Sequence, residues 1–155
     1  MLHDRLPRVL DRFVEGAKNL KIGDPLGEAT DVGPLAGRDL REALVRQIEK
    51  SVAGGARIAS GGKRTLSRGF FFEPTVVEHV RPGMPMFDEE VFGPVAALVR
   101  AEDIDDAVRL ANLSRYGLGA TVWTANVRTA GELAARIESG QVFFNGIVAS
   151  EPRLP

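Results

Sequence analysis

The sequence has no cysteine among its 155 residues. This absence excludes disulfide bonds, thiolate metal sites and thiol nucleophiles together. Histidine is scarce as well, because His3 and His79 stand alone and far apart, and neither is assigned a role. The sequence also lacks a Ser/His/Asp spacing, an HExxH motif and a GxxxxGK(S/T) loop. The common hydrolytic and nucleotide-loop chemistries therefore find no support, and we predict no metal site.

Long apolar runs and an excess of one charge are missing too. No run approaches the roughly 20 apolar residues that a membrane-spanning helix requires. The first residues include Asp4, Arg5, Arg8 and Asp11, which leaves no hydrophobic core for a signal peptide. With 20 basic and 21 acidic side chains, the net charge of -1 gives no basic surface for nucleic acid or an anionic membrane. The default expectation is a cytoplasmic globular protein of about one domain.

Hydrophobic periodicity predicts four helices, at about residues 5–20, 39–53, 103–112 and 126–138. Gly54 and Gly55 should end the second helix, and Asp103 and Asn126 should cap the third and fourth. Strands are expected at about residues 56–59, 70–72, 75–80, 95–99, 119–124 and 141–145. The run at 95–99 is almost wholly apolar, which is typical of a strand buried on both faces.

The alternation of strands and helices in the second half predicts an α/β fold with a mainly parallel sheet and flanking helices. No internal repeat or linker divides the chain. The last residues, Ser150 to Pro155, have neither a helix cap nor a polar tail, which indicates a truncated chain.

The segment Phe87-Asp88-Glu89-Glu90-Val91-Phe92-Gly93-Pro94-Val95 resembles a motif of the aldehyde dehydrogenase superfamily. Each flanking match is weak alone, but together they follow the family order along nearly the whole chain. They are Ile22–Pro25, Asp31–Leu35, Gly69–Thr75, Ala111-Asn112, Tyr116–Ala120, Ser139–Val142 and Phe144–Gly146. The ending, residues 147–155, resembles the succinate-semialdehyde dehydrogenase branch.

The resemblance implies that residues 1–155 are the C-terminal portion of an aldehyde dehydrogenase catalytic domain, without a complete cofactor-binding domain. The parent enzyme would use NAD or NADP to oxidise an aldehyde, expected to be succinate semialdehyde, to its carboxylic acid. In the family, the catalytic cysteine and the other catalytic residues lie upstream of this region. We therefore assign no catalytic residue and predict that the chain alone is inactive. Cofactor binding by the chain alone is not predicted.

Three residues receive binding roles from the resemblance. Glu90 would accept hydrogen bonds from both hydroxyls of the nicotinamide ribose, Phe92 would pack near the nicotinamide, and Ser150 would help to bind the substrate's distal carboxylate. Without the resemblance, Glu89 and Glu90 are a solvated acidic pair, Phe92 is a core residue and Ser150 is a surface serine. Arg153 could assist Ser150 but is not assigned.

Two functions of different classes remain open. The first is a fragment of an NAD(P)-dependent aldehyde dehydrogenase, complemented by an upstream half. The second is a non-catalytic interaction or oligomerisation module that docks on full-length dehydrogenase subunits, since family members form dimers and tetramers through this part. Partners would be a small-molecule aldehyde in the parent enzyme and further dehydrogenase subunits, but neither nucleic acid nor a membrane.

Overall fold

A computed structural model describes residues 6–65 and 68–149 of the chain. The chain divides into two compact units, Met1–Arg100 and Ala101–Pro155. None of the helices in the described residues is long and apolar enough to cross a membrane.

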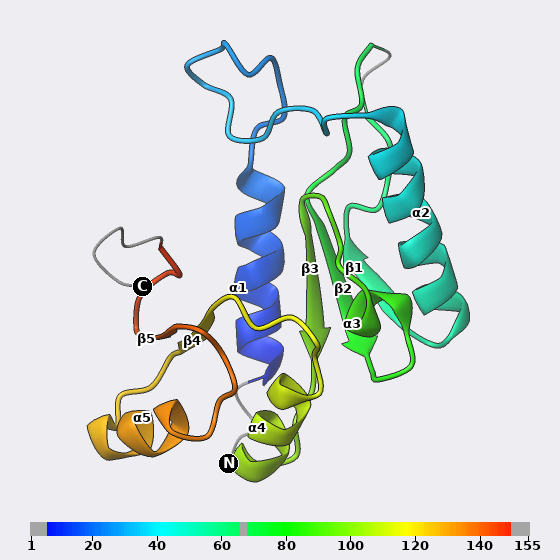
Figure 1. Cartoon of the computed structure of the whole chain (residues 1–155). Helices are drawn as coiled ribbons and strands as arrows, with labels where there is room; N and C mark the ends of the chain where they lie inside the picture. Colours follow the sequence, from blue (N-terminus) through cyan, green and yellow to red (C-terminus); the bar gives the residue numbers. More distant parts are fainter. Residues whose placement is uncertain (1–5, 66–67, 150–155) are drawn as a thin grey trace. The chain divides into compact units, whose positions relative to one another are not determined.

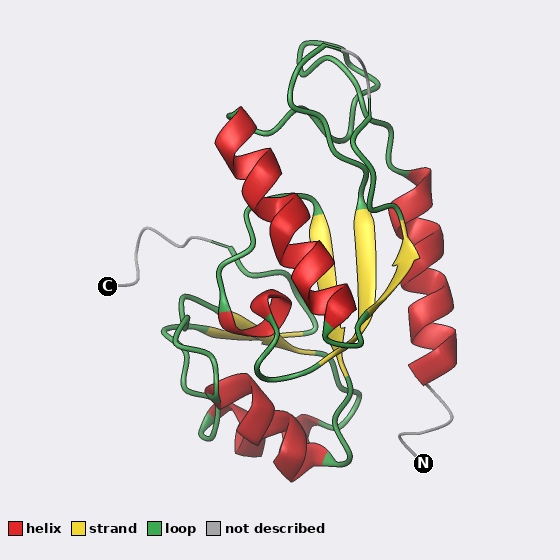
Figure 2. Cartoon of the chain, turned by 90° about the vertical axis from the view of Figure 1, so that its right-hand side faces the viewer, coloured by secondary structure: helices red, strands yellow, loops and turns green. Residues whose placement is uncertain are grey.

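The first unit is built around a three-stranded sheet with helices on both sides. Along the chain it contains α1 (Leu6–Asn19), α2 (Arg38–Ala53), β1 (Arg57–Ser60), β2 (Thr75–Val80), α3 (Pro85–Asp88) and β3 (Val95–Val99). The strand order is β1-β2-β3, with β1 antiparallel and β3 parallel to β2. The sheet lies between α1 and α2 in both views (Figures 1 and 2). The central strand β2 is therefore the most buried strand, as expected for a strand covered on both faces.

The core of this unit lies between the sheet and α2. Leu44 and Ile48 recur one turn apart on α2, so they share the helix face that packs against the sheet. They join residues from β2 and from the segment after it, namely Val77, Val80, Met84 and Met86, together with Ala56 and Phe72. This buried cluster fixes the position of α2 against the chain that follows β2.

The end of α2 confirms the prediction that two glycines stop it. Gly55 adopts φ +106°, a left-handed conformation that costs glycine little. Its N–H donates to Val52 O (2.9 Å), and Ala56 N–H donates to Ser51 O (3.0 Å). This pair of bonds satisfies the last carbonyls of the helix, which lack partners within it. The observed bounds of α2 lie within one residue of those predicted.

Two predictions for this unit were wrong, and one helix was not predicted. β3 is only half-buried and Ala97 is exposed, because among the described residues β3 has a neighbour on one side only. Residues 70–72 form no strand, and Phe72 makes a single bridge to Arg64 although its side chain is buried in the core. The short helix α3 was not predicted, because its four residues are too few to show a helical period.

The second unit contains α4 (Ile104–Asn112), β4 (Ala120–Val122), α5 (Val127–Ala134) and β5 (Val142–Phe144), with β4 and β5 parallel. Both predicted caps are confirmed. Asp103 Oδ1 accepts from Asp106 N (2.7 Å), and Asn126 Oδ1 accepts from Arg128 N (3.0 Å). Hydrogen bonds from the Glu102 backbone N–H and from the Arg109 side chain lower the pKa of the Asp106 carboxyl.

The helix α5 ends at Ala134, four residues before the predicted Glu138. The side chain of Asn112, at the end of α4, forms hydrogen bonds with backbone groups that follow α5. Asn112 Nδ2 donates to Arg136 O (2.8 Å), and Glu138 N donates to Asn112 Oδ1 (3.0 Å). These two bonds offer the chain an alternative to another helical turn.

Asn145 directly follows β5 and ties this strand to Thr124, the second residue after β4. Its Nδ2 donates to Thr124 O (2.8 Å), and its Oδ1 accepts from Thr124 N (2.9 Å). Asn145 also adopts φ +50°, which asparagine tolerates better than most residues. The segment after β4 is thus the partner of this strand end.

We expect Asn145→Ala to lower the free energy of unfolding by about 2 kcal/mol, because two hydrogen bonds are lost and alanine is strained at positive φ. Asn145→Gly removes the same bonds but tolerates the backbone conformation, so it should cost less. Urea unfolding of the two variants measures the difference. Equal losses of unfolding free energy in the two variants would show that backbone strain at position 145 does not contribute to the effect of Asn145→Ala.

Candidate functional site

Glu90 and Phe92 lie on the same short loop, which joins α3 to β3. Glu90 is exposed, and the Phe92 side chain is 58% exposed. Val91 lies between them, is half-buried and packs against the core cluster. Alternate residues thus face the core and the solvent, as in any extended segment. The interpretation of Phe92 as a core residue is wrong, since more than half of the residue is exposed.

The helix α2 anchors the start of this region through a buried serine. Ser51 is fully buried, and its Oγ accepts from Met86 N (3.0 Å) at the beginning of α3. That N–H is one of the first in the short helix and has no partner within it. Asp88 then holds the preceding turn, because its Oδ2 accepts from Gly83 N (3.0 Å). The position of α3 is thereby fixed before the chain reaches Glu90.

A second side chain of α2, Gln47, contacts the loop itself. Gln47 Nε2 donates to Glu89 Oε2 (2.9 Å) and to the backbone carbonyl of Glu90 (3.1 Å). Gln47 stands four residues before Ser51, so both side chains emerge on one side of the helix. One side of α2 therefore holds both α3, through Ser51, and the first residues of the loop, through Gln47.

The end of the loop is fixed by a close backbone contact. Gly93 has φ +155°, and a Cβ built on it would lie 2.6 Å from Leu44 Cδ2. Pro94 O accepts from Thr75 N (2.8 Å), which joins the loop to the first residue of β2. Only glycine leaves room for Leu44 at this point. The loop is thus held by α2 at its start and by α2 and β2 at its end.

Sequence reasoning found Glu90 and Phe92 through the family resemblance, but it missed the residues that hold them. A usable signal was present, because Gln47 lies three residues after Leu44, and Ser51 lies three residues after Ile48. That spacing puts both polar side chains beside the apolar stripe of α2, where a partner is required. Ser150 and Arg153 lie outside the described residues.

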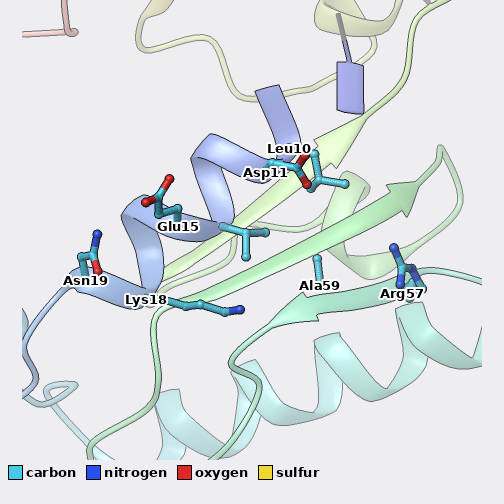
Figure 3. Close-up of a pocket in the computed structure, with 8 residues that line it drawn as sticks. Leu10, Asp11, Glu15, Lys18, Asn19, Arg57 and Ala59 are labelled. Carbon is cyan, nitrogen blue, oxygen red and sulfur yellow. The ribbon is translucent and has the colours of Figure 1, made fainter. Parts of the chain in front are cut away.

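A separate pocket of about 440 Å³ lies between α1 and β1 (Figure 3). It is lined by Leu10, Asp11, Val14, Glu15, Lys18 and Asn19 of the helix and by Arg57 and Ala59 of the strand. Its charges are of both signs, and neither Glu90 nor Phe92 lines it. The described residues include no group of three or more His, Cys, Asp or Glu side chains placed to hold a metal ion.

Comparison with known proteins confirms the resemblance. The model of the aldehyde dehydrogenase family matches residues 2–155. A succinate-semialdehyde dehydrogenase (NADP+) of Mycobacterium avium is 46% identical over 145 residues, which are 94% of this chain and 31% of that protein. A succinate semialdehyde dehydrogenase (NAD(P)+) of Escherichia coli is 46% identical over 144 residues, which are 93% of this chain and 31% of that protein.

Solved structures agree with this match and support the α/β fold class. An NAD+ complex of a Bacillus cereus aldehyde dehydrogenase superposes with a TM-score of 0.93 at 34% identity, over 98% of this chain and 31% of that one. A betaine aldehyde dehydrogenase of Staphylococcus aureus in complex with NAD+ gives a TM-score of 0.89 at 31% identity, over 95% of this chain and 30% of that one. The chain therefore spans about a third of the length of the relatives it matches.

Proposed function

Because the chain belongs to the aldehyde dehydrogenase family, we propose that it supplies one wall of the nicotinamide site in an NAD(P)-dependent aldehyde dehydrogenase. The whole enzyme would oxidise an aldehyde to its carboxylic acid. The observation that carries this proposal is the loop after α3, which presents Glu90 and Phe92 side by side toward solvent. Contacts from α2 and β2 hold that loop at both ends.

The chemistry of the two side chains suits a nicotinamide riboside. A carboxylate has only acceptor sites, so Glu90 can receive hydrogen bonds from two vicinal ribose hydroxyls at once. An exposed phenyl ring beside it offers an apolar face to a flat heterocycle. The cofactor accepts hydride from the substrate, and that transfer requires a well-defined distance between ring and substrate. Glu90 and Phe92 would restrict the position of the ring.

Succinate semialdehyde is the substrate we propose, because the Mycobacterium avium and Escherichia coli relatives are succinate-semialdehyde dehydrogenases. NADP or NAD serves as the cofactor in this proposal, in keeping with the names of the same two relatives. We propose that Ser150 donates a hydrogen bond to the distal carboxylate of this substrate, together with cationic side chains from elsewhere in the enzyme.

These residues by themselves would not complete the reaction. The family resemblance implies attack on the aldehyde by a cysteine thiolate, and this sequence has no cysteine. A serine without an adjacent histidine base is a poor nucleophile, and Glu90 as a base would have nothing to activate. We therefore propose that the isolated chain does not oxidise aldehydes.

A role as a docking module for other dehydrogenase subunits is the second candidate. It is favoured by large apolar side chains that the second unit leaves exposed, such as Leu118 at 90% and Val127 at 86%. Groups of exposed apolar side chains are typical of surfaces that another polypeptide covers. Mixing the chain with a full-length relative and measuring the mass of the complex tests this role.

The proposed enzymatic role is tested in a chimera, meaning the Escherichia coli relative with its matched segment replaced by this chain. We expect the isolated chain to form no NADPH from NADP+ and succinate semialdehyde, and the chimera to form it. Turnover by the isolated chain would contradict the need for an external nucleophile. A chimera that folds and assembles like its parent, yet neither binds NADP+ nor turns over, would contradict the proposed cofactor site.

A further inference from the structure

Gln47, on α2, donates hydrogen bonds to both residues of the acidic pair Glu89 and Glu90. A glutamine side-chain nitrogen carries two hydrogens, so it can serve two acceptors at once. One hydrogen points to the Glu89 carboxylate (2.9 Å) and the other to the Glu90 carbonyl (3.1 Å). The two bonds have different consequences, because only the second acts on the backbone of Glu90.

The carbonyl of Glu90 belongs to the peptide group that leads to Val91 and Phe92. Holding this carbonyl fixes the orientation of the peptide plane, and with it the direction in which Glu90 and Phe92 leave the loop. Two earlier anchors, Ser51 Oγ to Met86 N (3.0 Å) and Glu89 N to Pro85 O (3.0 Å), fix peptide groups that precede the one after Glu90. Gln47 restrains the peptide group after Glu90 directly, through its bond to the carbonyl.

We propose that Gln47 is a positioning residue for Glu90, and that its bond to the Glu90 carbonyl sets the affinity of the site for the nicotinamide ribose. This inference rests on the proposed function, in which the Glu90 carboxylate binds that ribose. The bond to Glu89, by contrast, contributes to stability alone. The two effects can therefore be separated by exchanging donor and acceptor between Gln47 and Glu89.

Three variants of the chimera separate the effect on stability from the effect on cofactor affinity. Glu89→Gln keeps an acceptor oxygen opposite Gln47, so both bonds survive. Gln47→Glu removes both donors and sets two carboxylates against each other. The double variant, Gln47→Glu with Glu89→Gln, restores a bond in the reverse direction, from the amide at position 89 to the carboxylate at position 47. It still offers no donor to the Glu90 carbonyl.

We expect Gln47→Glu to lower Tm and to raise the KM for NADP+ about fivefold, which corresponds to the loss of one hydrogen bond. The double variant should regain Tm but keep the raised KM. Glu89→Gln should leave the KM unchanged and lower Tm less than Gln47→Glu does, because its amide oxygen still accepts a hydrogen bond but is a weaker acceptor than a carboxylate. The KM for succinate semialdehyde should not change in any of the three, since none of these side chains is assigned to the aldehyde.

Recovery of both Tm and KM in the double variant would overturn the positioning role and leave Gln47 as a stabilising residue. Glu90→Gln, measured alongside, separates this failure from failure of the proposed function. If Glu90→Gln raises the KM and Gln47→Glu does not, only the positioning role fails. If Glu90→Gln leaves the KM unchanged, both fail.

The isolated chain provides a second readout that needs no activity. The chemical shift of the Glu90 carbonyl carbon reports whether that oxygen accepts a hydrogen bond. We expect this shift to change in Gln47→Glu and in the double variant, and to stay unchanged in Glu89→Gln. An unchanged shift in Gln47→Glu would overturn the inference even if the chimera proves inactive.

Discussion

Replacing Glu90 with glutamine in the chimera is expected to raise the KM for NADP+ about thirtyfold. Glutamine has nearly the same shape, but it offers one neutral acceptor oxygen in place of a carboxylate with two. Hydrogen bonds to a charged group contribute about 1.5–3 kcal/mol each, so the loss of about 2 kcal/mol gives a factor of this size. Glu90 is exposed, and we expect the variant to fold like the unsubstituted chimera.

The same substitution should also lower kcat, because a less restrained ribose lets the nicotinamide move away from the substrate. Misplacement by about 1 Å is enough to slow a reaction up to 100-fold. Steady-state kinetics with NADP+ as the varied substrate measure both constants. Glu132→Gln, in an exposed position of α5, is the matched control and should change neither. A Glu90→Gln variant with unchanged constants would contradict the assignment.

Replacing Gly93 with alanine is expected to destabilise the fold by about 3 kcal/mol. The added Cβ would lie 2.6 Å from Leu44 Cδ2, and Gly93 has φ +155°. Leu44 is fully buried in the core cluster, so its methyl group has no free space into which to turn. Overpacking of a core costs about 1–3 kcal/mol, and a backbone conformation suited to glycine adds about 1–3 kcal/mol.

Unfolding of the isolated chain in urea measures this loss. Gly131→Ala is the matched control, because a Cβ at Gly131 in α5 meets nothing within 4 Å. Alanine favours a helix more than glycine does, so this control should be stabilising by up to about 1 kcal/mol. Combining Gly93→Ala with Leu44→Ala removes the clash. The double variant should therefore lose less unfolding free energy than the two single variants lose together. If the two losses are strictly additive, contact with Leu44 is not the cause of the destabilisation by Gly93→Ala.

Local signals predicted the helices well because each signal acts over a few residues. The caps at Asp103 and Asn126 accept backbone N–H groups two or three residues away. The stop at Gly54 and Gly55 likewise depends on hydrogen bonds within the last turn. Sequence alone therefore determines where these helices begin and α2 ends. The end of α5 could not be predicted, since it depends on Asn112 of another helix.

The candidate site shows the same division between local and long-range information. The family resemblance identified Glu90 and Phe92, whereas the local residues without the resemblance placed Phe92 in the core, where it does not lie. Gln47 meets its partners across 42 and 43 residues of sequence, and Ser51 meets Met86 across 35. The residue pattern of α2 does not predict which residues those partners are. The burial of β3 was overestimated for a related reason, since strand order decides which apolar strand is central.

The most direct test of the cofactor assignment is the affinity of the chimera for a cofactor analogue that lacks both hydroxyls of the nicotinamide ribose. We predict that the unsubstituted chimera binds this analogue about thirtyfold more weakly than NADP+, whereas the Glu90→Gln variant binds the two with similar affinity. An equal loss of affinity for the analogue in both proteins would contradict the account, because Glu90 would then make no contact with those hydroxyls.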